Sequence, residues 1–160
     1  MLSIIVAIAK NNCIGIKNKI PWHIPEDFKY FKEKTMGNTV LMGQTTFQSI
    51  LDYLKKPLPG RKTVVLTRDE NFVPPADVRV FYSIDEAMEK LKNENVFVCG
   101  GASIYAQMID KVDVLYITHV HQIVDGDTFF PEIDMNVWKE VERDDRDGFS
   151  FVKYRRVHSS

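Results

Sequence analysis

Short apolar runs rich in isoleucine and valine recur along this 160-residue chain, and they limit its fold more than any other feature. The first run, Leu2–Ala9, is apolar at almost every position rather than at every second one. A strand of this kind is buried on both faces, which is typical of a parallel sheet covered by helices on both sides. Further strands are predicted at Thr39–Gly43, Lys62–Thr67, Val78–Tyr82, Asn95–Cys99, Val112–Val120, Trp138–Glu142 and Phe149–Val157.

Stretches with helical spacing separate most of these strands. Helices are predicted from about Glu26 to Thr35, from Gln44 to Leu54, from the Ser83 cap through Lys92, and from Gly101 through Ile109. A strand hairpin comes last, with Asp144–Gly148 as its connection. This order predicts an α/β fold, in which four helices cover both faces of an eight-stranded, mostly parallel sheet with an antiparallel C-terminal edge strand. The length suits a single domain over residues 1–160.

Composition and spacing exclude several kinds of partner. The formal net charge is -1, so no basic excess is present for a nucleic acid or a membrane surface. No apolar run approaches the length of a membrane span, and the N-terminus lacks the charged leader of a signal peptide. Cys13 and Cys99 are the two cysteines, and they lack CxxC spacing, so neither a disulfide nor a zinc site is indicated. A reducing cytoplasm is the simplest setting for such a protein. His119 and His121 share a strand face without an apparent third ligand, so we expect no metal site. By default, we expect a monomer.

Features suited to a nucleotide gather where predicted strands end. Gly43 joins a strand directly to a helix with Thr45 and Thr46 in its first turn, and the free N–H groups of such a helix start suit a phosphate. Thr45 could instead serve only as a helix cap. Gly100–Gly101 allows close approach of a ligand to the backbone, although the full GxGxxG pattern is absent. Because ligands bind at the carboxyl ends of parallel strands, this coincidence predicts a nucleotide site.

Two charged residues stand in unusual settings. Asp27 and Phe31 lie four residues apart and share a helix face. If that face lines a pocket, Asp27 is a buried acid with a raised pKa beside a flat apolar wall; otherwise it only decorates an acidic first turn. Arg61 ends a stiff, proline-rich connection and is either a solvated surface charge or a clamp for a ligand carboxylate.

Several motifs in one order and spacing give the chain a resemblance to a known family. They are Ile14-Gly15, Pro21-Trp22-His23-Ile24-Pro25 with Asp27 and Phe31, Met42-Gly43 with Thr46, Pro57-Leu58-Pro59-Gly60-Arg61, Gly100-Gly101 with Tyr105, and Gly126-Asp127-Thr128 with Phe130-Pro131. Over nearly its whole length, the chain resembles dihydrofolate reductase of the bacterial chromosomal type. The resemblance implies reduction of 7,8-dihydrofolate to 5,6,7,8-tetrahydrofolate, by hydride transfer from NADPH to C6 and protonation at N5. It also implies a place in one-carbon metabolism, in support of thymidylate and purine synthesis, and binding of antifolate inhibitors.

Two other functions stay open at this point. A related reductase of the riboflavin pathway has the same fold and reduces a different ring, but its substrate lacks the glutamate tail that Arg61 would bind. A non-catalytic nucleotide-binding module would bind the cofactor without turnover. The combination of Asp27, Phe31 and Arg61 favours dihydrofolate reductase over the reductase of the riboflavin pathway.

The resemblance implies catalytic roles for Asp27, Trp22 and Thr118. Asp27 would bond the N3 and 2-amino edge of the pterin ring, with Thr118 bonding back to Asp27. Its charge would raise the proton affinity of N5 through an ordered water that Trp22 positions. The implied substrate contacts are the backbone carbonyls of Ile5 and Cys99, the side chains of Phe28, Phe31, Ile50 and Leu58 around the pterin and benzoyl groups, and Arg61 on the glutamate α-carboxylate.

The resemblance also implies how NADPH binds. Ala7 and Ile14 would hold the carboxamide through backbone groups, and Thr46 with the Gly100–Ser103 turn would hold the pyrophosphate. The peptide between Gly100 and Gly101 would be cis. The other implied cofactor contacts are Gly15, Gly43, Gln44, Thr45, Leu66, Thr67, Arg68, Ala102, Ser103, Ile104, Tyr105 and Thr128.

The chain departs from the family pattern around the cofactor. Gln44 stands where an arginine usually meets the 2′-phosphate, and Ser103 stands where an arginine often meets the pyrophosphate. Because Gln44 has no charge, we expect Arg68 and Thr67 to recognise the 2′-phosphate, with Gln44 assisting.

Two connections also differ from the family pattern. Asp52–Lys55 lengthens the connection that precedes Pro57, and the last hairpin is shorter than usual. A short hairpin has little chain with which to reach the loop around Asn11 to Lys19. We therefore expect this loop to stay on the Asp127 side through the catalytic cycle, with opening as its only other state.

Overall fold

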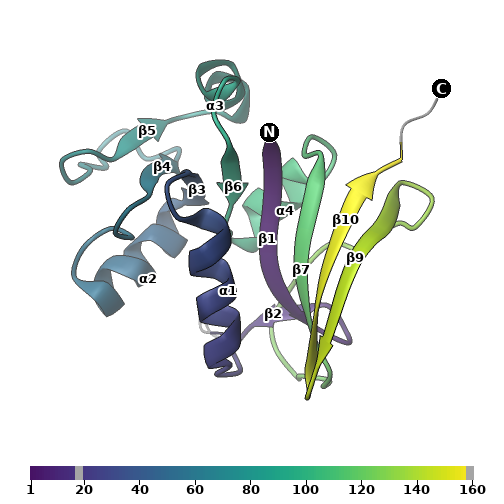
Figure 1. The fold of residues 1–160 in the computed structure, drawn as a ribbon. Coiled ribbons are helices and arrows are strands. Elements are labelled where there is room, and N and C mark those ends of the chain that lie inside the picture. The colour runs from purple at the N-terminus through teal and green to yellow at the C-terminus, as the bar shows by residue number, and fades with distance from the viewer. Residues whose placement is uncertain (17–19, 158–160) are drawn as a thin grey trace.

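The computed structural model describes residues 1–16 and 20–157. Within them the chain forms an eight-stranded sheet with helices on both faces, and a small two-stranded sheet (Figure 1). The large sheet has the order β5 (Arg79–Phe81), β4 (Lys62–Leu66), β3 (Thr39–Gly43), β6 (Val96–Val98), β1 (Leu2–Ala9), β7 (Val114–Val120), β10 (Phe149–Arg156) and β9 (Trp138–Arg146). The small sheet pairs β2 (Cys13–Gly15) with β8 (Thr128–Phe129), and the helices are α1 (Pro25–Thr35), α2 (Gln44–Leu54), α3 (Ile84–Leu91) and α4 (Ala102–Met108).

The predicted α/β architecture is confirmed. Each predicted strand and helix is present, and Leu2–Ala9 and Thr39–Gly43 have the predicted bounds. Neighbouring strands from β5 to β7 are parallel, whereas the C-terminal strand β10 is antiparallel to both of its neighbours. The edge itself is β9, so the antiparallel strand lies one position in from the edge. In the described ranges, no helix is long and apolar enough to cross a membrane.

The predicted connection of the last hairpin is wrong. β9 continues through Arg146, so Asp144–Arg146 is strand, and Asp147–Gly148 turns the chain. Gly148 has a φ of 85°, which suits a tight Asp-Gly turn. Because β9 is an edge strand and is exposed after Trp138, charged residues fit in it without a core face. The strands β2 and β8 are additions to the prediction, since pieces of 3 and 2 residues have no hydrophobic pattern of their own.

Alternate side chains of the central strands point into two hydrophobic cores, one on each face of the sheet. On β3, Val40 and Met42 join Phe47 of α2 in one core. Leu41, between them, lies in the other core with Ala87 of α3. Figure 1 shows α1 and α2 in front of the sheet and α4 behind it. The central strands are therefore buried on both faces, as their continuous apolar runs predict.

The carboxyl ends of the parallel strands lie along the same end of the sheet, and two glycine turns meet there. The backbone N–H of Gly43, at the end of β3, donates to the carbonyl of Gly100, just beyond β6, over 2.9 Å. The Gly100–Gly101 peptide is cis, as the resemblance implies. The turns that start α2 and α4 are therefore adjacent.

The described part of the loop after β1 lies against Asp127. The N–H of Asp127 donates to the carbonyl of Gly15 over 3.1 Å, and Gly15 is paired with Thr128 in the small sheet. This agrees with the expected side for the loop, although residues 17–19 lie outside the described residues. The behaviour of the loop during turnover stays a prediction.

Candidate active site

Asp27 lies in the first turn of α1, against β7. The helix starts with Pro25, followed by Glu26 and Asp27, which suits the positive end of the helix dipole. The Oδ1 atom of Asp27 accepts a hydrogen bond of 2.6 Å from Oγ1 of Thr118, which is 2% exposed. Burial raises the pKa of Asp27, and the bond from Thr118 opposes part of that rise. The structure therefore favours a half-buried acid with a raised pKa over a residue that only decorates the helix surface.

Trp22 has a buried indole N–H with no hydrogen-bond partner among the described residues. Buried donors of this kind are normally satisfied by an ordered water or a ligand, because an unpaired buried donor costs free energy. The indole N–H can therefore hold the water that the resemblance assigns to Trp22.

Tyr105, in α4, links this helix to strand β1. Its hydroxyl donates to the carbonyl of Ile5 over 3.0 Å, and its ring meets Phe130 edge-on at 5.2 Å. A Cβ placed on Gly100 would lie 3.5 Å from the same hydroxyl. The sequence predicts Tyr105 only as a cofactor contact, because no local pattern reveals its bond to Ile5. Burial raises the pKa of the nearby Cys99 thiol far above its usual range, so this cysteine stays protonated.

Arg61 is tethered to the far end of α1. Its Nε donates to the carbonyl of Pro59 over 3.0 Å, and its Nη1 donates to Oγ1 of Thr35 over 3.2 Å. Thr35 in turn donates to the carbonyl of Phe31 over 2.7 Å. Arg61 is half-buried, and this desolvation lowers its pKa. Thus Arg61 is an oriented cation rather than a freely solvated one, and Thr35 is a supporting residue that the sequence does not reveal.

The apolar side chains predicted around the substrate come from three segments. Phe31 of α1, Ile50 of α2 and Leu58 of the following connection are half-buried. Phe28 of α1 is 49% exposed and lies 5.4 Å from the ring of His23. Ile50 and Leu58, together with Cys99, pack against the core under α2.

The region predicted to bind the cofactor is formed by glycines and backbone groups. The N-caps of α2 and α4 are Gly43 and Gly101, and neither helix start has a side-chain cap. The alternative role of Thr45 as a cap is therefore wrong. A Cβ on Gly100 or on Gly101 would lie 3.4 Å from Oγ1 of Thr46, and a Cβ on Gly43 would lie 3.3 Å from the Ile104 side chain. The φ of 119° at Gly100 favours glycine there, whereas a Cβ on Gly43 or Gly101 would only contact the side chain of Ile104 or Thr46.

Gln44 and Thr67 lie together beside the end of β4. Oγ1 of Thr67 donates to Oε1 of Gln44 over 2.6 Å and accepts from the N–H of Asp69 over 3.0 Å. Because its carbonyl oxygen is engaged, Gln44 has its amide NH2 group to offer to a ligand. Arg68 follows Thr67 in the sequence and is exposed, whereas Leu66 before Thr67 is buried.

The remaining predicted cofactor residues lie around these turns. Ser103 accepts from Nε2 of Gln107 over 3.1 Å, and Thr128 donates to Asp127 over 2.8 Å. Ala7, Ile14 and Ala102 are half-buried, at the end of β1, in β2 and at the start of α4.

The two histidines each contact a hydroxyl group. Nε2 of His119 lies 2.7 Å from the Tyr154 hydroxyl, and Nε2 of His121 lies 2.9 Å from Oγ of Ser150. Among the described residues, no group of three or more His, Cys, Asp or Glu side chains could hold a metal ion.

Comparison with known proteins identifies the family. The family model for dihydrofolate reductase matches residues 1–156. Dihydrofolate reductase of Neisseria gonorrhoeae is 42% identical over 159 residues, which cover 98% of this chain and 96% of that protein. Dihydrofolate reductase HdrB of Haloferax volcanii is 40% identical over 159 residues, with 96% and 82% covered.

A solved structure agrees with the sequence comparisons. Dihydrofolate reductase from Enterococcus faecalis, complexed with NADP(H) and RAB-propyl, superposes with a TM-score of 0.85 at 37% identity, covering 98% of this chain and 96% of that one. The chain belongs to the dihydrofolate reductase family.

Proposed function

We propose that this chain reduces 7,8-dihydrofolate to 5,6,7,8-tetrahydrofolate with NADPH, and that Asp27 is the catalytic carboxylate. The observation that supports this most strongly is the hydrogen bond of 2.6 Å that joins the half-buried Asp27 to the buried Thr118. A carboxylate in such a setting is typical of a catalytic site rather than of a helix surface. Family membership makes this the reaction to expect of it.

The residues at the strand ends fit NADPH. Two helix starts without side-chain caps lie side by side, and side chains at Gly100 or Gly101 would fill the space beside the Thr46 hydroxyl. Thr46 and the Gly100–Ser103 turn therefore suit the pyrophosphate, with Gly43, Thr45, Ile104 and Tyr105 around them. Backbone groups of Ala7 and Ile14 would bind the carboxamide, next to Gly15 and Thr128. NADPH, when bound, supplies the hydride for C6 of the substrate.

Asp27 acts on the pterin ring from its N3 and 2-amino edge. Its carboxylate bonds this edge, while Thr118 fixes the orientation of the carboxylate. The negative charge favours a positive charge at N5, so the proton affinity of N5 rises. Trp22 holds the water through which the proton reaches N5, since its buried indole N–H needs such a partner. The backbone carbonyls of Ile5 and Cys99 face the pterin edge.

The rest of dihydrofolate lies along α1. Phe28, Phe31, Ile50 and Leu58 contact the pterin and benzoyl groups. Arg61 binds the α-carboxylate of the glutamate, because Thr35 and the carbonyl of Pro59 already fix its orientation. A fork of two N–H groups on one carboxylate is both strong and directional.

The 2′-phosphate of NADPH is recognised beside the end of β4. Arg68 supplies the charge, Thr67 and Gln44 supply the polar groups, and the buried Leu66 precedes them at the end of β4. An arginine is always charged and can form two bonds to a phosphate. This arrangement replaces the cation that the family usually has at the position of Gln44.

Further properties follow from the composition. We expect one domain over residues 1–160 and a monomer that works in the cytoplasm. The net charge of -1 gives it no electrostatic attraction to nucleic acids or to anionic membranes. Its partners are then small molecules, namely dihydrofolate, NADPH and antifolate inhibitors.

One assay tests the proposal against its alternatives. NADPH oxidation is followed first with dihydrofolate and then with the deaminated pyrimidine intermediate of the riboflavin pathway. Turnover with dihydrofolate alone is expected. Turnover with the riboflavin-pathway compound alone indicates the related reductase, and NADPH binding without turnover of either compound indicates a non-catalytic module.

A further inference from the structure

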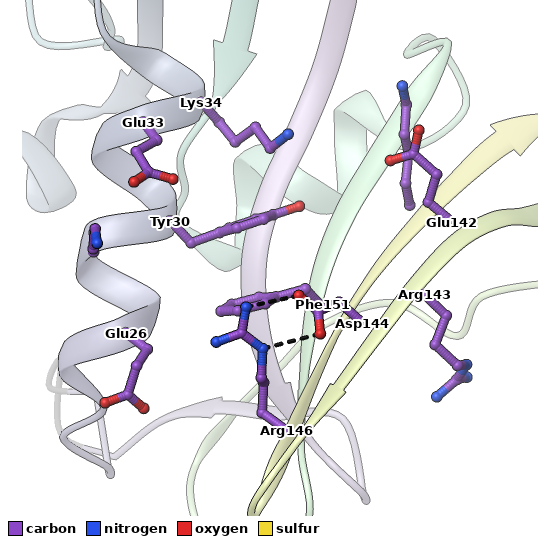
Figure 2. Close-up of a pocket in the computed structure, with 11 residues that line it drawn as sticks. Glu26, Tyr30, Glu33, Lys34, Glu142, Arg143, Asp144, Arg146 and Phe151 are labelled. Carbon is purple, nitrogen blue, oxygen red and sulfur yellow. Dashed lines mark hydrogen bonds and ion pairs between the residues drawn. The ribbon is translucent and has the colours of Figure 1, made fainter.

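A pocket lies between α1 and the β9–β10 hairpin (Figure 2). Phe28 and Phe31 of α1 are not among the residues that line it. Its volume is about 570 Å³, and an aromatic stack crosses it. The rings of Tyr30 on α1 and Phe151 on β10 are parallel within 8°, and their centroids are 4.1 Å apart. We call these two rings the hairpin stack.

Cations cover both ends of the hairpin stack. Figure 2 shows Lys34, Tyr30, Phe151 and Arg146 in that order along one column. The Lys34 ammonium lies 5.3 Å from the Tyr30 ring, and the Arg146 guanidinium lies 5.5 Å from the Phe151 ring. Asp144 holds Arg146 with two hydrogen bonds, of 2.9 and 2.8 Å. Such cation–π contacts favour the stacked arrangement.

The hairpin stack and the Asp27–Thr118 bond lie side by side. Asp27 and Tyr30 are about one turn apart on α1, so their side chains emerge close together. Their partners, Thr118 on β7 and Phe151 on β10, are directly opposite each other in the antiparallel ladder. The helix is thus attached at two neighbouring points to a single cross-strand pair.

The N-terminal half of α1 has few other anchors. Its N-cap, Ile24, makes no side-chain cap bond. All residues of α1 are described, and Thr35 is the one that is fully buried; it lies at the opposite end of the helix from Asp27. The position of Asp27 against β7 therefore depends strongly on Tyr30, because a short helix is held by its packing rather than by its own hydrogen bonds.

We propose that Tyr30 and Phe151 are positioning residues, which hold Asp27 against Thr118 and keep water away from it. This inference rests on the proposed function, in which Asp27 is the catalytic carboxylate. Without the stacked rings, α1 can move away from the sheet, and the pocket between α1 and the β9–β10 hairpin then opens toward Asp27. The carboxylate then loses its fixed distance to the substrate, and misplacement of about 1 Å is enough to slow catalysis strongly.

The hairpin stack should also affect the proton affinity of Asp27. Burial is the larger cause of the raised pKa of Asp27, so added water lowers that pKa toward its ordinary value. Tyr30 and Tyr105 are close enough for the charge of Asp27 to act on them, and burial raises the pKa of both, so they stay neutral. The other charged groups facing the pocket are Glu26, Lys29, Glu33, Lys34, Glu142, Arg143, Asp144, Arg146 and Lys153.

The test compares variants that keep or remove the ring contact. Tyr30→Phe keeps both rings and is expected to leave kcat for dihydrofolate within about twofold of wild type. Tyr30→Leu and Phe151→Leu remove the same contact from opposite sides, and each is expected to lower kcat about tenfold or more. KM for NADPH should not change, because neither ring belongs to the cofactor side. In both leucine variants the pKa of Asp27, followed by carboxyl NMR in the free protein, should fall.

Val152→Ala is the matched control for lost stability. Val152 is the next residue on β10, is fully buried, and packs in the core on the other face of the sheet. The Val152→Ala substitution should lower the melting temperature without changing the pKa of Asp27. Unchanged titration of Asp27 in either folded leucine variant overturns the proposal, as does an equal change in the Val152→Ala variant. Because the titration needs no turnover, it tests the hairpin stack even if the assay with dihydrofolate fails.

Discussion

The substrate side and the cofactor side of the site are built from different groups. On the substrate side, side chains are held by other side chains, with Thr118 on Asp27 at 2.6 Å and Thr35 on Arg61 at 3.2 Å. On the cofactor side, most of the proposed groups are backbone N–H groups beside glycines such as Gly43. A substitution removes a side chain but leaves a backbone N–H in place. Single substitutions should therefore reduce function more on the substrate side.

Asp27→Asn should show the largest effect. The amide keeps the shape of the side chain but loses the charge that favours protonation at N5, so kcat at pH 7 and above should fall about a hundredfold or more. At acidic pH the loss should shrink, because more of the substrate arrives already protonated. The measurement is the pH profile of kcat for both proteins.

Glu26→Gln is the matched control for this change. Glu26 precedes Asp27 in the same first turn, but its side chain is exposed. Its kcat should stay within about twofold of wild type. Near wild-type turnover by Asp27→Asn at neutral pH contradicts the assignment of the catalytic carboxylate.

Arg61→Leu should give the next largest effect. Loss of a charge-assisted bond should weaken binding of dihydrofolate and of folate-shaped inhibitors by about 1.5–3 kcal/mol. Inhibitors without a glutamate should bind as before. Calorimetry with one inhibitor of each class measures the difference, and Lys56→Leu, an exposed lysine of the same connection, serves as control. Equal weakening of both classes means that Arg61 acts through the structure instead.

Arg68→Ser tests the one place where the cofactor side depends on a charged side chain. NADPH binding should weaken by about 1.5–3 kcal/mol, or ten- to a hundredfold, while NADH binding stays nearly unchanged. Gln44→Arg should tighten NADPH binding, with a gain that fades as salt rises. The Michaelis constants of both cofactors give the answer. If their ratio is the same in wild type and Arg68→Ser, the 2′-phosphate is recognised elsewhere.

Elements with a strong local pattern could be predicted from the sequence, and others could not. The continuous apolar run at Leu2–Ala9 and the strand before Gly43 have the predicted bounds, because burial on both faces leaves a clear signal. The end of β9 has no such signal in the sequence, because the charged residues Asp144–Arg146 fit an exposed edge strand as well as they fit a turn. The short strands β2 and β8 exist only because they pair with each other.

The same distinction holds within the site. Asp27 and Arg61 stand in local motifs, so they could be named from the sequence. The bond from Tyr105 to Ile5 joins residues 100 positions apart, and the contact of Tyr30 with Phe151 depends on the register of β10 against β7. The groups proposed to contact ligands could therefore be predicted from the sequence, whereas the groups that hold them in place could be found only from the fold.

The smallest expected effect concerns stability, and it sharpens the contrast between function and folding at Asp27. Burial raises the pKa of Asp27 above the value of 3.8 that it has when unfolded. The folded protein therefore binds more protons than the unfolded chain between these two values, so the contribution of Asp27 to stability falls as pH rises through that window. Above the raised pKa the folded protein bears the cost of a partly desolvated carboxylate.

Asp27→Asn removes this cost, because the amide is never charged. The inactive variant should therefore be more stable than wild type at pH 7, by about 1.4 kcal/mol for each tenfold rise in the proton affinity of Asp27 on folding. The gain should disappear as pH falls below the unfolded value, where wild type is also neutral. Urea unfolding of both proteins across the acidic range measures the difference in the free energy of unfolding. A variant that is less stable than wild type at neutral pH means that the charge of Asp27 is favourably solvated in the fold, against the burial on which its proposed role depends.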